Sequence, residues 1–147
     1  MKLSTRSRYG LRAMLALAMN EEGKSMMTKE IAEKQNLPAT YLEQLMLSLR
    51  KGRLVLATRG AHGGYVLSRE AREISLAEIV EALEGPLDIA DCADVPSCGI
   101  DSEGCALRDV FAAANKALYD AFDRVTLAEL AEKQRNKEGS LAGMYFI

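Results

Sequence analysis

The stretch that decides the fold runs from Pro38 to Ser68 and reads PATYLEQLMLSLRKGRLVLATRGAHGGYVLS. Its first part predicts a helix to about Lys51, because the apolar residues recur at i, i+3, i+4 and i+7 and form one stripe. Pro38 fits the first turn of this helix, where a missing N–H costs little. The apolar stripe consists of Leu42, Leu45, Met46 and Leu49, and the opposite polar face carries Thr40, Tyr41, Glu43, Gln44, Ser48, Arg50 and Lys51.

A β-hairpin is predicted directly after this helix. Residues 54–58 and 65–68 read as two strands, and a Gly-rich turn with a basic tip, Arg59 to Gly64, joins them. A hairpin in this position would form the wing of a winged helix-turn-helix.

Two further helices are expected before the hairpin-forming stretch. Residues 8–20 predict a helix that is buried on a broad face. Thr28 is expected to N-cap a second, short helix through Gln35. A short helix, a tight turn and an amphipathic helix with a polar outer face are typical of a helix-turn-helix. We therefore expect a mainly α-helical fold in which residues 1–85 form a winged helix-turn-helix DNA-binding domain.

The distribution of charge supports DNA binding. The 147 residues carry a formal net charge of −2, but residues 1–72 hold 13 basic and 6 acidic side chains, and residues 73–147 hold 6 basic and 15 acidic ones. Such an asymmetry between halves indicates a nucleic-acid-binding end. The alternative is a small basic domain whose charges only solvate it.

The chemistry of DNA suggests a role for each predicted contact. Thr40 and Gln44 would reach base edges in the major groove, and Arg59 would enter a narrow minor groove. Glu43 would repel phosphate unless it accepts a hydrogen bond from cytosine, and so would act as a specificity filter. The remaining basic side chains would contact phosphates. The predicted interface comprises Lys2, Arg6, Arg8, Thr40, Tyr41, Glu43, Gln44, Arg50, Lys51, Arg59, His62 and Gly63.

The second half begins with a capping box at Ser75 and Glu78, and the helix that it starts is expected to end at Gly85. Residues 86–105 show no periodicity and contain all three cysteines, so we expect a loop there. A long helix is predicted from Ala106, with a heptad-like apolar seam along one side. The seam comprises Leu107, Phe111, Ala114, Leu118, Ala121 and Val125.

A seam of this length requires a partner helix, and the simplest partner is the same helix in a second copy. We therefore expect a homodimer, although packing of the seam on the chain's own first helix is an alternative and both can hold together. A second capping box, Thr126 and Glu129, predicts a short helix after the long one. The long and short helices together span residues 106–135, and residues 136–147 are expected to form a tail.

The three cysteines are candidate metal ligands. Cys92, Cys98 and Cys105 lie within 14 residues, and thiolates select zinc, copper(I) or iron–sulfur clusters. The wide spacing lacks the C-x2-C pairs of zinc knuckles and suits a cluster better. Three free cysteines in a surface loop are the alternative. No fourth protein ligand is evident, and the candidates are Glu43, Asp101 and Glu103.

These residues together resemble the Rrf-type bacterial regulators. The resemblance rests on residues 1–14, on 41–45 with 49–51, on the Arg59-Gly-x-x-Gly-Gly-Tyr65 wing, and on 75–80 with the three cysteines and 126–130. The chain looks most like the iron–sulfur members, which include a regulator of cluster assembly and a nitric-oxide sensor. The resemblance implies a dimeric winged-helix transcription factor in which Cys92, Cys98 and Cys105 bind a cluster that alters DNA affinity.

The chain departs from that subgroup at the fourth ligand. Arg108 stands where the assembly regulators have a histidine, and Arg8 stands near the place of the first-helix aspartate of the nitric-oxide sensors. A [2Fe–2S] centre is expected, with [4Fe–4S] as the alternative, in a response to iron–sulfur assembly, iron, redox state or nitric oxide. The alternative is a winged-helix regulator that senses thiol redox state or a small effector without a cluster.

Enzymatic function is not expected. The chain has one histidine and lacks H-E-x-x-H, G-x-S-x-G and phosphate-loop motifs, so it has little acid–base equipment. It also lacks an apolar run of about 18 residues and a signal-peptide core. We expect a cytoplasmic protein whose partners are double-stranded operator DNA and a second copy of itself, with no membrane partner.

Overall fold

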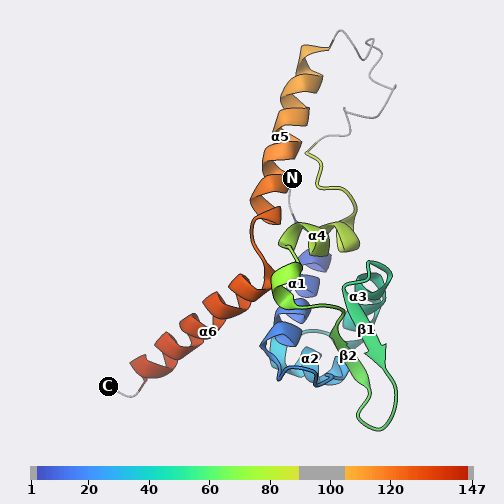
Figure 1. The fold of residues 1–147 in the computed structure, drawn as a ribbon, viewed down its shortest axis with the longest axis vertical. Helices are drawn as coiled ribbons and strands as arrows, with labels where there is room; N and C mark the ends of the chain where they lie inside the picture. The colour runs from blue at the N-terminus through green and yellow to red at the C-terminus, as the bar shows by residue number, and fades with distance from the viewer. Residues whose placement is uncertain (1–2, 90–104, 146–147) are drawn as a thin grey trace.

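The computed structural model describes residues 3–89 and 105–145. Of the predicted site residues, Lys2, Cys92, Cys98, Asp101 and Glu103 lie outside the described residues. The element order is α1 (Thr5–Met19), α2 (Thr28–Gln35), α3 (Ala39–Lys51), β1 (Val55–Thr58), β2 (Gly64–Leu67), a 3-10 turn (Ala71–Glu73), α4 (Leu76–Glu84), α5 (Ala106–Asp123) and α6 (Leu127–Met144). Figure 1 shows a head of α1–α4 and the hairpin, from which α5 and α6 project.

The head is built around one apolar core. Helix α1 contributes Ala13, Met14 and Leu17, which contact the inner faces of α2 and α3. Close approach of α1 to α4 depends on Gly10, because an added Cβ would lie 2.2 Å from a Leu83 methyl carbon. The core extends into the first residues of the hairpin and into α4 and α6, through Leu54, Val55, Ile74, Ile79 and Leu127.

The hairpin is antiparallel and has the predicted position. Val55 pairs with Leu67 and Thr58 pairs with Gly64. Outside the hairpin, Met26 forms a bridge with Tyr65, and each residue's N–H donates to the other's carbonyl at 3.0 and 2.8 Å. The segment before α2 therefore anchors the wing to the head.

Both predicted capping boxes are present. The hydroxyls of Ser75 and Thr126 accept hydrogen bonds from the third helical N–H of α4 and α6, respectively. In turn, the carboxylates of Glu78 and Glu129 accept from the backbone N–H of the cap residue. Ser75 and Thr126 also form a bridge with each other, so the two helices start side by side.

Three local predictions need correction. The N-cap of α2 is Met27 and not Thr28, because the Glu30 carboxylate accepts from the Met27 N–H at 2.7 Å and the helix starts one residue earlier. Pro38 occupies the N-cap of α3 and not its first turn. The last helix is not short: α6 continues past residue 135 to Met144 through most of the expected tail.

Helix α5 lies only partly against the head. Leu118, Tyr119 and Phe122 pack on a small cluster of Ala77, Val80 and Leu87, which belongs to α4 and the segment after it. No residue of α5 is fully buried, and Leu107 and Val110 are 63% and 62% exposed. Within one chain, only the part of the α5 seam near the head is therefore packed, mainly against α4.

The junction between α1 and α4 contains a buried hydroxyl. Ser7 is completely buried, and its Oγ donates to Glu84 Oε1 at 2.6 Å. The same carboxylate accepts from the Ser4 N–H at 2.9 Å and from the Ser4 hydroxyl, at the N-terminus of α1. The Ser4 and Ser7 hydroxyl donors lower the pKa of Glu84, since they stabilise its charged form.

We expect Ser7→Ala to lower the free energy of unfolding by about 1 kcal/mol, the net value of one such hydrogen bond. Urea denaturation measures this change.

Glu84 makes the stability of the fold depend on pH. Because the pKa of Glu84 is lowered in the folded state, its contribution to the free energy of unfolding is complete above the ordinary pKa of about 4.3 and is lost as pH falls through the lowered value. Glu84→Gln should therefore reduce the loss of stability on acidification below about pH 5.

The matched control is Glu132→Gln, which removes an exposed carboxylate from α6. Its acid transition should follow that of the wild type. Identical acid transitions for Glu84→Gln and the wild type would contradict the assigned role of Glu84.

Candidate nucleic-acid interface and cysteine site

The outer face of α3 is set by its buried face. Leu42, Leu45, Met46 and Leu49 are all 0% exposed, whereas Thr40, Glu43 and Gln44 are exposed on the other side. Asn36, in the left-handed region with φ 51°, makes the turn that separates α2 from α3. The three predicted base-contacting side chains are thus free to meet a ligand together.

Leu47 lies on this same outer face. It is one turn beyond Glu43 and Gln44 and is 51% exposed. Leu47 is absent from the predicted interface, because that prediction rests on polar side chains. Its spacing of seven residues from Thr40 was the available signal.

Tyr41 differs from its neighbours because it is half-buried. Its ring meets the Tyr9 ring of α1 edge-on, with a centroid distance of 5.9 Å and an interplanar angle of 76°. The ring therefore packs the start of α3 against α1.

The wing presents its basic tip to solvent. Arg59 and His62 are exposed, and the turn between them contains Gly60 with φ 112°. Gly63 and Gly64 are required by close contacts: an added Cβ would lie 2.7 Å from the Thr58 carbonyl oxygen and 2.3 Å from the Met26 carbonyl oxygen, respectively. Ser25 holds the tip by donating its hydroxyl to the His62 carbonyl at 2.6 Å.

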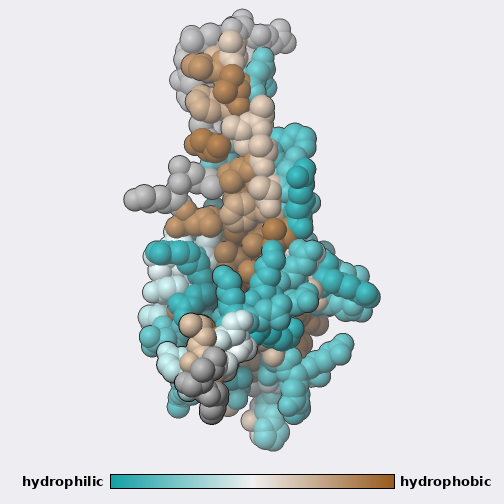
Figure 2. All heavy atoms as spheres, turned by 90° about the vertical axis from the view of Figure 1, so that its left-hand side faces the viewer, coloured by the Kyte–Doolittle hydropathy of each residue, from teal (hydrophilic) through white to brown (hydrophobic). Residues whose placement is uncertain are grey.

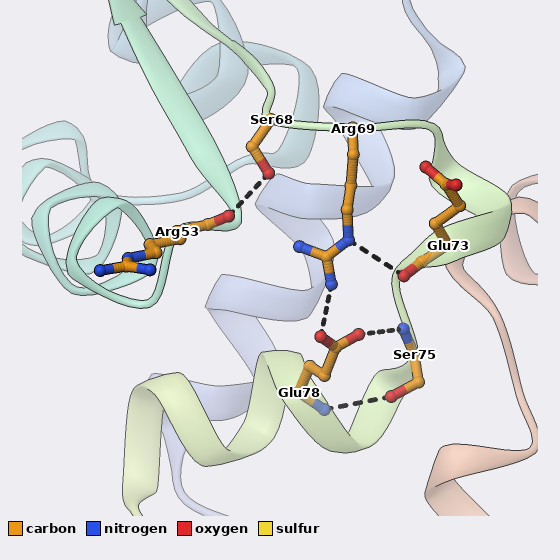
Figure 3. Close-up of polar contacts among 6 residues, drawn as sticks. All are labelled: Arg53, Ser68, Arg69, Glu73, Ser75 and Glu78. Atoms are coloured by element: carbon orange, nitrogen blue, oxygen red, sulfur yellow. Dashed lines mark hydrogen bonds and ion pairs between the residues drawn. The ribbon is translucent and has the colours of Figure 1, made fainter.

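A polar strap joins the base of the wing to α4, as Figure 3 shows. The Ser68 hydroxyl donates to the Arg53 carbonyl at 2.7 Å, and Arg53 has a left-handed φ of 57°. The next residue, Arg69, donates to the Glu73 carbonyl at 3.1 Å and forms an ion pair with Glu78, the capping residue of α4. The role of Arg69 is not predictable from neighbouring residues, since its ion-pair partner Glu78 lies on another element.

The predicted phosphate-contacting residues fall into two groups. Arg8, Arg50 and Lys51 are exposed. Arg6 is half-buried and points into the head, where its Nε donates to the Leu83 carbonyl at 2.6 Å and one Nη donates to the Ser48 hydroxyl at 2.5 Å. Arg6 thus links α1, the end of α4 and α3.

The interface and the long helices lie on different sides of the head. In Figure 1, α3 and the hairpin lie to the right, whereas α5 extends upward and α6 extends to the lower left. Acidic side chains gather where α4 meets α5. There, burial and then the charges of Asp123 and Asp88 raise the pKa of Glu81, and Asp123 and Glu81 raise the pKa of Tyr119. Negative charge is thus concentrated away from the basic face.

Of the predicted cysteine ligands, Cys105 alone falls within the described residues. It is a half-buried free thiol at the N-cap of α5. Within residues 3–89 and 105–145, no group of three or more His, Cys, Asp or Glu side chains gathers in a form that could hold a metal ion. Cys105 begins α5 at the end that points away from the head, whereas Glu43 belongs to α3 within the head (Figure 1).

No helix in the described part of the chain is both long and apolar enough to cross a membrane.

Comparisons with known proteins identify the family. Residues 3–133 match the Rrf2 family model, which is described as iron-dependent transcriptional regulators. Protein rrf2 of Nitratidesulfovibrio vulgaris is 38% identical over 130 residues, covering 88% of this chain and 87% of that protein.

Solved structures agree with this match. CymR of Bacillus subtilis, described as the global cysteine regulator, has a TM-score of 0.75 and 37% identity over 90% of this chain and 98% of its own. IscR of T. potens has a TM-score of 0.74 and 34% identity over 91% and 88%. These relatives confirm the mainly helical winged-helix fold, and they are regulators and not enzymes. The chain belongs to the Rrf2 family of transcriptional regulators.

Proposed function

We propose that this protein is a homodimeric, sequence-specific DNA-binding regulator whose DNA affinity is controlled by an iron–sulfur cluster. The observation that carries the DNA-binding part is the exposure of Thr40, Glu43 and Gln44 on α3 next to a wing that is hydrogen-bonded to the head and has Arg59 at its tip. A helix of this kind fits the major groove, while the wing reaches the adjacent minor groove. Arg8, Arg50 and Lys51 supply phosphate contacts.

The proposal of a homodimer rests on α5. Figure 2 shows an apolar band along this helix, on the side of the molecule opposite the wing. Helix α4 packs against only the proximal half of this band. The distal half stays uncovered, because Leu107 and Val110 are more than 60% exposed. Two copies that paired along this band would bury it, as helices with heptad-like seams do. The resulting dimer would carry two wings for two half-sites.

The proposal of a cluster rests on the donor set. Three thiols in 14 residues, of which Cys105 begins a helix, are soft ligands of the type that hold iron–sulfur clusters. When bound, the cluster would supply redox and ligand-exchange chemistry. Its type is proposed to be [2Fe–2S], and the candidates for its fourth ligand are Glu43, Asp101, Glu103 and a group from outside the chain.

The route from the cysteine segment to the DNA face runs through Arg6. The segment leaves the head just after α4, where the Asn115 side chain of α5 bonds the Ile89 N–H at 2.7 Å and the Asp88 carboxylate at 2.9 Å. Arg6 holds the Leu83 carbonyl at the end of α4 and the Ser48 hydroxyl on α3. A shift of α4 would therefore be passed to the recognition helix.

A second candidate is regulation by thiol redox state or a small effector without a cluster. It is favoured by the 37% identity to CymR, which is described as a cysteine regulator. Oxidation of cysteine thiols would then replace cluster chemistry as the signal.

The DNA interface is tested with Arg59→Ala. We expect DNA affinity to fall by about tenfold, because a lost groove contact costs about 1–3 kcal/mol, and the salt dependence of binding to decrease. Fluorescence anisotropy with duplexes selected from a random library, measured at several salt concentrations, gives both quantities. Lys133→Ala removes the same charge from α6 and serves as the control. An equal loss of DNA affinity in both variants would indicate only a general effect of charge and would contradict the groove contact of Arg59.

The cluster is tested by anaerobic purification. We expect a coloured protein that contains iron and sulfide, and Cys98→Ala should lose both. Ser97→Ala, a change in the same segment without loss of a thiol, should retain them. Iron-free wild-type protein whose DNA affinity responds to peroxide would instead support the thiol mechanism. A colourless anaerobic protein without iron would rule out the cluster.

The dimer is tested with Leu107→Asp, which places a charge in the exposed part of the α5 seam. We expect a shift from dimer to monomer in analytical ultracentrifugation, because pairing would bury that charge. Leu56→Asp is the control, since Leu56 is 53% exposed on β1 and lies in the wing. A wild-type protein that sediments as a monomer at micromolar concentration would contradict the homodimer.

A further inference from the structure

An apolar side chain lies in the middle of the polar face of α3. Leu47 follows Thr40 by seven residues, so the two lie on nearly the same line along the helix, with Gln44 between them and Lys51 one turn further. All four side chains are exposed. Leu47 is the only large apolar member of this line.

The fold itself gives Leu47 no packing role. The core contacts of α3 come from the opposite stripe, in which every side chain is 0% exposed, while Leu47 remains 51% exposed. The apolar band of α5 projects from the other side of the head, so pairing along that band does not cover α3 (Figure 1). A single exposed leucine is common on protein surfaces, and its position within a proposed reading face is what distinguishes this one.

We propose that Leu47 is a specificity-determining residue that contacts the methyl group of a thymine in the major groove. This inference rests on the proposed insertion of α3 into the groove. Among the base edges of the major groove, the C5-methyl of thymine is the apolar group, and aliphatic and aromatic side chains contact it. Gln44, one turn earlier, suits an adenine edge, so the two would read neighbouring positions of an A/T-containing half-site.

The proposed contact has a direct chemical test, because deoxyuridine differs from thymidine only by the absence of that methyl group. Duplexes are first selected from a random library with the wild-type protein. Each dT of the best duplex is then replaced by dU, one position at a time, and the Kd is measured at constant salt. We expect one position at which the replacement weakens wild-type binding about fourfold, the effect of burying one methyl-sized apolar group.

The variants assign this effect to the side chain. Leu47→Ala should bind the dT and dU duplexes with equal affinity, because the contact is already lost. Leu47→Met, which keeps an apolar chain of similar volume, should retain part of the discrimination. Leu141→Ala is the matched control: Leu141 is 57% exposed on α6, and its loss should leave the fourfold difference unchanged. Thermal unfolding checks that each variant is folded.

Two results would overturn the inference. One is wild-type protein that does not distinguish dU from dT at any position of its selected duplex. The other is discrimination that persists in Leu47→Ala. Failure of the proposed function looks different, since wild-type protein would then select no sequence, or Gln44→Ala would bind the selected duplex as the wild type does.

Discussion

The buried stripe of α3 is the constraint on which the rest of the structure depends. Four side chains without solvent exposure lock the rotation of the helix about its axis, because a turn of one residue would bring Glu43 into the core in one direction and Gln44 in the other. The outer face, the turn before α3 and the hairpin after it take their places from that rotation. Arg6 adds a polar tie between this helix and the end of α4. What α3 presents to solvent is thus decided by what it buries.

Much of this architecture is predictable from local signals. The 3.6-residue periodicity located α1, α3 and α5, and the two capping boxes located the starts of α4 and α6. The wing was predictable because its glycine-rich turn separates two short β-prone runs. The outward position of Thr40, Glu43 and Gln44 followed from the same periodicity. Each of these signals is carried by residues close in sequence.

The features that escaped prediction depend on other causes. The far part of α6 has no buried residue beyond Ala131, so no apolar periodicity marks its continuation to Met144. Thr28 was predicted to be the N-cap of α2, but the Glu30 carboxylate accepts from the Met27 N–H, and Met27 is the cap residue. The inward turn of Arg6 and the pairing of Arg69 with Glu78 arise between elements that only the folded chain brings together. Most of the cysteine site belongs to residues 90–104, outside the described residues.

The length of α5 gives the molecule a mechanical property. Eighteen residues span about 27 Å, and the base of this helix is held against α4 while Cys105 lies at its tip. Such a helix works as a lever with its fulcrum at the head: a tilt of about 10° at the base moves the tip by about 5 Å. Conversely, a displacement of the helix tip near Cys105 is reduced several-fold by the time it reaches α4. Only a large displacement of the tip would therefore move α4 appreciably, so the length of α5 shields the head from small movements at its far end.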